Sequence, residues 1–168
     1  MIDMQPRAAQ ADHDKGTLYL LFHIDDQRFA LNVHEVVEVL PRLPLKPVLH
    51  APAWVAGILA HRGRLVPVVD LTALCIGRPA VQRTSTRLVL VHYRAGLQLG
   101  LVLEHATETL RCHPGEFKPY GVHNAPAPYL GPVRQDDQGM LQRIEVGDLL
   151  PEAVHQLLYV DEPSGAST

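Results

Sequence analysis

The sequence predicts a mainly β protein of two small lobes, and three observations carry this prediction. The chain of 168 residues contains 14 prolines and 12 glycines but only 5% aromatic residues, which is typical of short elements joined by tight turns. Short apolar runs recur along the chain, and polar turn residues stop each of them. A pattern in the first half of the chain also returns in the second half. This length suffices for one domain or two small lobes.

Two stretches predict β-hairpins, because in each an apolar run stops at a polar turn and then resumes. The expected strands are 18–24 with 29–33, and 87–93 with 97–103. The similarity extends beyond the hairpins, since 18–42 aligns with 88–112 and sets Glu38 against Glu108. The alternative is that any two β-hairpins look alike. The preferred interpretation is a repeat that gives one lobe at about 17–80 and a second at about 86–150, each closing into a barrel to remove its exposed edges.

The remaining elements are an apolar run in each lobe and two short helices. The runs at 64–71 and 139–150 each include an acid near their end. Helical spacing follows at 70–76, before Gly77, and at 147–158. The polar, small-residue segments 1–16 and 156–168 are expected to be a flexible N-terminus and a C-terminal segment with a mobile tail.

Composition and charge exclude several classes of protein. The formal net charge of −3 provides no cationic field for nucleic acid or an anionic bilayer. No apolar run approaches the roughly 18 residues of a membrane span, and the N-terminus lacks the apolar segment of a secretory signal. Cys75 and Cys112 are read as reduced thiols, although counting alone leaves one disulfide open. A cytoplasmic protein is expected.

Catalytic motifs are missing from the sequence. The three serines include no GxSxG elbow, and neither GxxxxGK[ST] nor GxGxxG occurs. The ten histidines include no HxH, HxxxH or HExxH pair. A metal site assembled from distant positions stays open as an alternative, but neither an enzyme nor a cofactor is predicted.

Glu38 stands out because it interrupts an apolar, strand-like run. A charge in such a run either faces solvent through strand alternation or is paired in a partly buried setting. Arg62 is the natural counter-ion candidate, because a guanidinium can bind a carboxylate through two hydrogen bonds. The sequence leaves both readings open.

The order of these residues resembles the CheW family of chemosensory coupling proteins over about 16–155. The resemblance rests on Phe22, the turn 25–28, 29–31, 36–39, Pro44, 51–52, 54–58, 62–63, 66–71, 100–102, Glu104, Glu108 and 130–131. It implies a single CheW-like domain at 17–155 with two five-stranded, SH3-like β-barrel lobes around a shared hydrophobic core. Members are not enzymes. They are adaptors that join the cytoplasmic tip of a chemoreceptor (a methyl-accepting protein) to the regulatory domain of a CheA-type histidine kinase, and they can pair with other CheW-like proteins in rings.

Carried over by position, the resemblance marks five residues at or supporting the receptor-facing region: Val36, Glu38, Gly57, Ile58 and Arg62. It also implies that Glu38 and Arg62 pair with each other, and that the protein is recruited from the cytoplasm to membrane-associated receptor arrays. The chain departs from the family where Ala60 and His61 replace Asn-Leu, which leaves a surface-sensing system of the Wsp type open. Two other functions remain as alternatives: a small β-barrel ligand- or metal-binding protein or enzyme, and a stand-alone inhibitor of the kinase regulatory domain.

Overall fold

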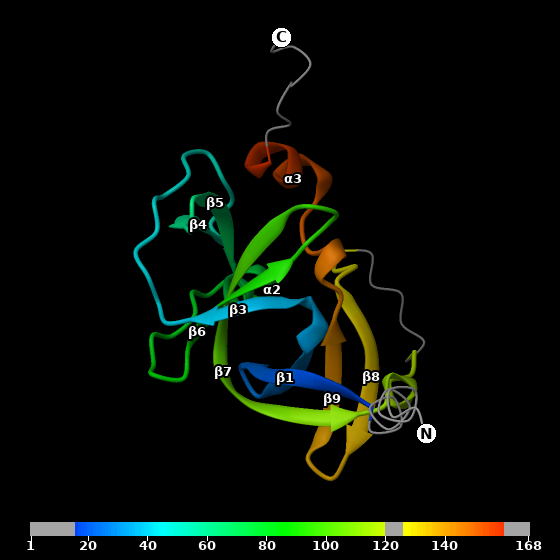
Figure 1. Ribbon diagram of the computed structural model, residues 1–168. Coiled ribbons are helices and arrows are strands. Elements are labelled where there is room, and N and C mark those ends of the chain that lie inside the picture. Colours follow the sequence, from blue (N-terminus) through cyan, green and yellow to red (C-terminus); the bar gives the residue numbers. More distant parts are fainter. Residues whose placement is uncertain (1–15, 120–125, 160–168) are drawn as a thin grey trace, which may run out of the picture.

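The computed structural model describes residues 16–119 and 126–159 (Figure 1). Its strands are β1 (Thr17–Ile24), β2 (Gln27–Asn32), β3 (Val36–Leu40), β4 (Val55–His61), β5 (Arg64–Asp70), β6 (Arg87–His92), β7 (Gln98–Cys112), β8 (Leu130–Asp136) and β9 (Gly139–Ile144). Two α-helices, α2 (Leu71–Ile76) and α3 (Glu152–Leu158), and three 3₁₀ turns, η1 (Val33–Glu35), η2 (Pro114–Glu116) and η3 (Val146–Asp148), join them. The predictions for residues 1–15 and for the tail from 160 lie outside the described residues.

The strands form two five-stranded barrels that share β7. The distal half of β7 (104–112) pairs with β1, which continues through β2 and β9 to β8; we call this set the β1 barrel. The proximal half (98–103) pairs with β6 and β5, which lead to β3 and β4; this is the β3 barrel. Figure 1 shows β7 curving from one barrel into the other.

The two barrels are closed in the same way. In the β3 barrel, Lys46 follows edge strand β3 and pairs with Ile58 of β4. In the β1 barrel, Lys118 follows β7 and pairs with Val133 of β8. The parallel pairs β5–β7 and β2–β9 also correspond. The barrels are therefore structural repeats of each other.

The lobe boundaries predicted at 17–80 and 86–150 are wrong, because the barrels exchange strands. The β1 barrel takes β1 and β2 from the first stretch and the distal half of β7, β8 and β9 from the second. The β3 barrel takes β3, β4 and β5 from the first stretch and β6 and the proximal half of β7 from the second. The repeat identifies which segments are alike, but their pairing is set by long-range contacts that alignment does not contain.

The exchange explains why the strands read as continuous apolar runs. Along β1, Tyr19 and Leu21 point into the β1 barrel, while Leu20 and Phe22 pack between the two barrels. Strands β6 and β7 alternate similarly between the β3 barrel interior and the shared core. Strands with both faces buried lose the apolar-polar alternation of a half-exposed sheet. The expected mainly β fold of two barrels around a shared core is confirmed.

The predicted helix at 70–76 is confirmed as α2. The Asp70 side chain caps it by accepting a hydrogen bond from the Ala73 N–H at 3.1 Å, and Gly77 ends it with φ of 76°. The helical segment expected at 147–158 is instead two pieces, η3 and α3, because Pro151 interrupts it.

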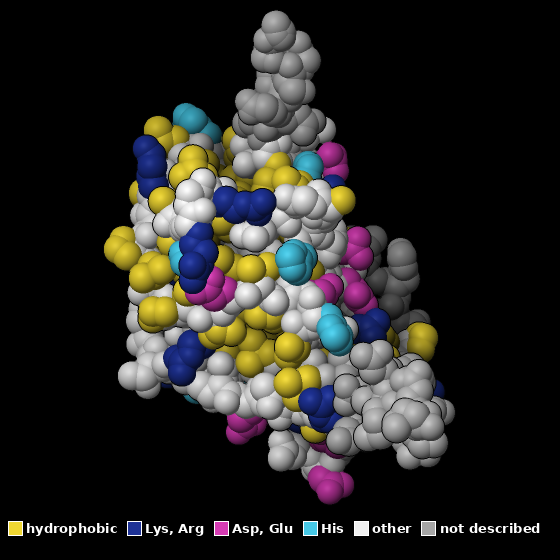
Figure 2. All heavy atoms as spheres, in the orientation of Figure 1, with side chains coloured by type: hydrophobic (Ala, Val, Ile, Leu, Met, Phe, Trp, Pro, Cys, Tyr) yellow, Lys and Arg dark blue, Asp and Glu magenta, His cyan; other side chains and the backbone are white. Residues whose placement is uncertain are grey.

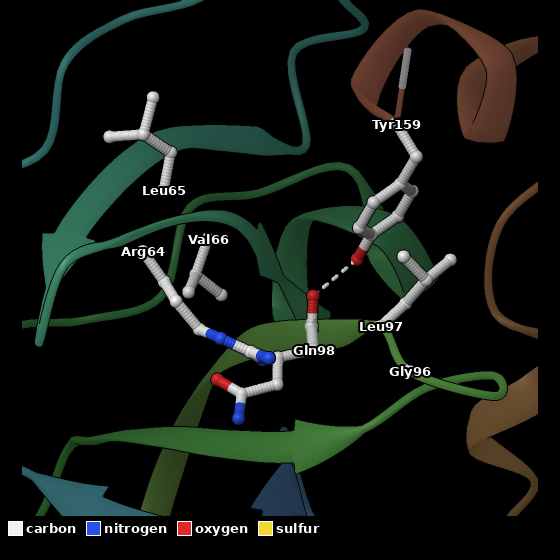
Figure 3. A pocket seen from close by; sticks show the side chains of 7 residues that line it. All are labelled: Arg64, Leu65, Val66, Gly96, Leu97, Gln98 and Tyr159. Carbon is white, nitrogen blue, oxygen red and sulfur yellow. Dashed lines mark hydrogen bonds between the residues drawn. The ribbon is translucent and has the colours of Figure 1, made fainter. Parts of the chain in front are cut away.

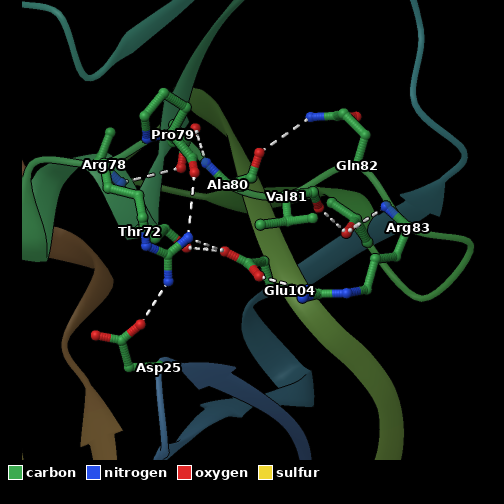
Figure 4. A network of polar contacts seen from close by, with 12 residues as sticks. Asp25, Thr72, Arg78, Pro79, Ala80, Val81, Gln82, Arg83 and Glu104 are labelled. Atoms are coloured by element: carbon green, nitrogen blue, oxygen red, sulfur yellow. Dashed lines mark hydrogen bonds and ion pairs between the residues drawn. The ribbon is translucent and has the colours of Figure 1, made fainter.

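Glu104 anchors the point where β7 passes between barrels (Figure 4). Its carboxylate is only 6% exposed, and it accepts hydrogen bonds from Thr72 Oγ1 at 2.9 Å and from Arg83 Nη1 at 2.8 Å. Burial alone raises the pKa of Glu104, but the hydrogen bonds from Thr72, the Val81 backbone and Arg83 outweigh it and lower the pKa. The network fixes α2 and the segment 78–86 against β7.

Candidate functional site

The candidate site lies on the open edge of β3, where Glu38 is held between β3 and β4. Strand β3 pairs with β6 on one side only, and its register shifts between Val36 and Glu38. The shift turns the Glu38 side chain, which is 30% exposed, toward the β4–β5 hairpin. A charge on this edge is therefore partly shielded from water and available to a partner from the hairpin.

Arg62 and Gly63 form the two-residue turn of that hairpin. His61 pairs with Arg64 across the turn, and Arg62 and Gly63 have φ of 52° and 76°. Two positive φ values in a two-residue loop match the twist of the strands that it joins. The tight turn projects the Arg62 side chain from a fixed point at the end of β4.

Glu38 and Arg62 form a two-pronged ion pair, and His61 joins it. Arg62 Nε donates to Glu38 Oε1 at 3.2 Å and Nη2 to Oε2 at 3.1 Å. His61 Nε2 lies 3.0 Å from Glu38 Oε1. Because a carboxylate oxygen only accepts, the His61 contact requires a proton on Nε2. Both oxygens of Glu38 are thus engaged by fixed donors.

This environment favours the ionised form of Glu38. The hydrogen bonds from Arg62 and then His61 lower the pKa of Glu38 to about 2. A lowered carboxyl pKa means that the interaction is complete above the ordinary value and is lost only as the pH falls through the folded value. The ion pair therefore persists at neutral pH.

The other predicted site residues have structural surroundings of their own. Val36 packs against the shared core. Ile58 exchanges two backbone hydrogen bonds with Lys46, at 2.8 and 2.9 Å. Gly57 has φ of 145°, and a Cβ there would lie 2.7 Å from the Lys46 carbonyl oxygen. The structure thus joins Glu38 and Arg62 directly, whereas Gly57 and Ile58 belong to the closure of the β3 barrel.

His61 is the contact that sequence reasoning missed, although it was noted as a departure from the family pattern. Its side chain is 19% exposed and touches both members of the pair, since Arg62 Nε lies 3.1 Å from its Nε2. The signal available was its position beside Arg62 in a hairpin turn. Residues 61 and 62 both reach Glu38 only because the turn is so tight.

Glu35, immediately before β3, has the opposite electrostatic character. Burial, reinforced by the nearby Glu145 carboxylate, raises the pKa of Glu35 to about 7 from 4.5, with Arg143 opposing the shift.

Replacing Glu35 with Gln should therefore stabilise the protein by roughly 1–2 kcal/mol near pH 8.5, after allowance for partial solvent exposure. A raised carboxyl pKa means that folding stability falls as the pH rises between the two values.

Urea denaturation of both proteins at about pH 5 and about pH 8.5 measures this effect of Glu35→Gln. The gain should be present at the higher pH and small at the lower one, where the carboxyl of Glu35 is largely protonated in the folded state. Equal gains at the two pH values would contradict the assignment.

The described part of the chain also contains a pocket and two cysteine thiols. A pocket of about 210 Å³ lies beside the β6–β7 turn, where the Tyr159 hydroxyl donates to the Gln98 carbonyl at 2.6 Å (Figure 3). Cys75 and Cys112 are unpaired, and burial raises the pKa of each thiol. Within 16–119 and 126–159, no group of three or more His, Cys, Asp or Glu side chains is arranged to hold a metal.

No helix in the described residues is long and apolar enough to cross a membrane.

A solved structure has a fold similar to that of this chain. The scaffolding protein TtCheW from Thermoanaerobacter tengcongensis superposes with a TM-score of 0.69, covering 77% of this chain and 84% of that chain. The sequences are 19% identical, so this likeness shows the fold alone.

Two similar sequences carry the name chemotaxis protein CheW, and a third is protein FrzA. The chain is 29% identical to chemotaxis protein CheW of Rhizobium meliloti over 62% of this chain and 66% of that protein. It is 21% identical to chemotaxis protein CheW of Bacillus subtilis over 90% of this chain and 98% of that protein. Protein FrzA of Myxococcus xanthus is 32% identical over 57% of this chain and 61% of its own length. The match thus spans slightly less than two thirds of the Rhizobium meliloti and Myxococcus xanthus proteins.

The family model for the CheW-like domain matches residues 18–154, which include both barrels and the Glu38–Arg62 pair. The chain belongs to the CheW-like domain family.

Proposed function

We propose that this protein is a non-catalytic adaptor that couples a methyl-accepting chemoreceptor to a CheA-type histidine kinase. The observation that carries the proposal is the Glu38–Arg62 pair, which ties the edge strand β3 to the turn of the β4–β5 hairpin. Beside the pair, Val37 and Val39 are 37% and 47% exposed on β3. Exposed apolar residues next to a rigid polar anchor suit binding to a helical surface.

The proposal gives the five predicted site residues a role and names the partners of the protein. Val36, Glu38 and Arg62 contact the receptor or support the strand that does, and Gly57 and Ile58 keep β4 in place beneath them. The kinase regulatory domain is the second partner, and pairing with other CheW-like proteins would extend the assembly into rings. The adaptor acts in the cytoplasm and is recruited to membrane-associated arrays. The output is chemotaxis or surface sensing.

Replacing Arg62 with Ala should reduce receptor control of the kinase at least roughly threefold, because Glu38 then keeps only His61 as a partner and no longer ties β3 to the hairpin turn. The measurement is kinase autophosphorylation in an array reconstituted from the kinase, a receptor cytoplasmic fragment and the adaptor. Arg111→Ala, an exposed change in the β1 barrel, is the control.

If Arg62→Ala left receptor control of the kinase unchanged, the assignment of this face to receptor binding would be wrong. Co-purification with the receptor fragment tests the inhibitor alternative, because an inhibitor would retain the kinase regulatory domain but not the receptor. Intact mass and metal analysis of the purified protein would expose a bound ligand or metal.

A further inference from the structure

Two histidines, His23 of β1 and His105 of β7, make the one contact between His rings within residues 16–119 and 126–159. Their ring centres are 5.3 Å apart, and the ring planes are inclined at 49°. On the face shown in Figure 2, by contrast, the His side chains lie apart from one another. A pair of imidazoles differs chemically from single histidines, because two ring nitrogens can bind the same metal ion.

The spacing of the two rings suits a shared ion. Metal–nitrogen bonds to imidazole are about 2.1 Å long, so two imidazoles on one tetrahedral ion have ring centres roughly 5 Å apart. The separation of 5.3 Å between His23 and His105 is close to this value. The rings are inclined rather than stacked, so small rotations about the side-chain bonds would let one nitrogen of each ring face a common point.

A β-bulge brings the two rings together. Strand β1 pairs with β7, and Leu21 lies opposite Glu108 while His23 lies opposite Glu104, so four positions along β7 match two along β1. His105 lies in this bulge with φ of 54°, a conformation that few residues other than glycine adopt. Bulges redirect side chains. The bulge therefore places the ring of His105 beside His23, although Glu104 is the residue opposite His23.

Ser85 holds His105 in the way that a metal ligand is commonly held. The Ser85 carbonyl accepts a hydrogen bond from the Ala106 N–H at 3.0 Å, which fixes Ser85 against the bulge. Its hydroxyl Oγ lies 3.5 Å from His105 Nδ1. The hydroxyl can accept the proton of Nδ1, and that tautomer leaves a lone pair on Nε2. Histidines that bind metals usually donate their other ring N–H to an oxygen in this manner.

The charged groups around His23 do not oppose a bound cation. Burial and then the His105 imidazole lower the pKa of His23 against the opposing Glu108 carboxylate, which favours the neutral imidazole that metals require. Arg28 lies opposite His23 in β2, but both oxygens of Asp136 engage it, at 2.9 and 3.1 Å. The positive charge of this arginine is therefore balanced locally.

We propose that His23 and His105 bind a divalent transition metal ion of the Zn²⁺ type, which links β1 to β7. Imidazole is a preferred ligand of such ions. Water completes the coordination, because in the described residues no third His, Cys, Asp or Glu is arranged to join the site. The ion would act next to Glu104, where β7 passes between the barrels. This inference is independent of the proposed function and adds a metal site to the adaptor.

Isothermal titration of the untagged full-length protein with ZnCl₂ tests the proposal. His23→Gln and His105→Asn should each weaken Zn²⁺ binding at least roughly tenfold, and Ser85→Ala roughly threefold to tenfold because its contact is long. Asn tolerates the positive φ of position 105, so this variant keeps the bulge. The matched control is His92→Ala, an exposed histidine at the end of β6, which should stay within about twofold of wild type. Thermal melting in EDTA checks the folding of every variant.

Structural readouts locate the ion. Excess Zn²⁺ should raise the melting temperature of wild type by a few degrees, and EDTA should reverse the shift. The ring ¹⁵N signals of His23 and His105 should move in the NMR spectrum, while that of His92 should not.

Three results would overturn the proposal: Zn²⁺ binding that survives His23→Gln and His105→Asn together, an equal loss in His92→Ala, or a melting temperature that Zn²⁺ leaves unchanged. None of them would affect the proposed coupling of receptor to kinase, which the reconstituted array tests separately.

Discussion

Gly57→Val should destabilise the protein by about 3–5 kcal/mol, the largest effect expected of any single change considered for this chain. Gly57 has φ of 145°, a backbone conformation that L side chains rarely adopt. A Cβ would also lie 2.7 Å from the Lys46 carbonyl oxygen and 2.9 Å from Leu45 Cβ. Relieving these contacts moves the 45–46 segment away from β4 and breaks the two backbone hydrogen bonds between Lys46 and Ile58.

Urea denaturation followed by circular dichroism measures this loss. Gly77→Ala is the matched control, since Gly77 also has a positive φ, of 76°, but a Cβ there would meet no atom within 4 Å. Conformational strain alone should cost about 1–2 kcal/mol at that position. If Gly57→Val cost no more than Gly77→Ala, the crowding at Lys46 would not be the source of the effect, and the closure of the β3 barrel would not depend on this glycine.

Glu104→Ala is expected to cost about 2–4 kcal/mol at neutral pH. The substitution leaves the Thr72 hydroxyl without its acceptor. It also leaves Arg78 and Arg83 without the carboxylate that forms an ion pair with each of them. Unlike a surface ion pair, this acid is only 6% exposed, so water does not replace the lost contacts fully. Loosening here affects both barrels, because β7 crosses from one to the other at this residue.

Chemical denaturation across pH isolates the contribution of the Glu104 charge. The pKa of Glu104 is lowered, so its stabilising effect is complete above the ordinary carboxyl pKa and is lost as the pH falls through the folded value. The gap between wild type and variant should therefore narrow in acid. Glu152→Ala, which removes a 65% exposed partner of Arg94 at 3.7 Å, should cost less than about 1 kcal/mol. Equal stability of Glu104→Ala and wild type at pH 7 would refute the anchoring role.

The sequence could predict the Glu38–Arg62 pair but not the His61 contact, although the two contacts span similar separations along the chain. Glu38 is conspicuous in sequence because it interrupts an apolar run, and Arg62 is conspicuous because it lies in a turn between two apolar segments. Their pairing could therefore be posed as one of two readings. The third contact, from His61, depends on the geometry of the hairpin turn, which places residues 61 and 62 within reach of one carboxylate.

Glu104 is a second residue whose partners the sequence could not predict. In sequence it follows an apolar run and matches a family position, which says nothing of its partners. In the structure it collects Thr72 from α2 and Arg83 from the segment before β6. These groups converge only when the barrels are assembled, so their role is a property of tertiary structure.

The sequence by itself determined the hairpins, the helix ended by Gly77, the repeat and the mainly β class, because turn residues, caps and apolar runs act over a few neighbouring positions. Tertiary structure was needed to show that β1 and β2 change places with β6 and the proximal half of β7 between the two stretches, which overturned the lobes at 17–80 and 86–150. Two similar strands offer similar edges and similar apolar faces. Each strand joins the edge that gives the most complete burial of the two barrel interiors and of the core between them. The free energy of this burial depends on the whole chain and not on a local segment.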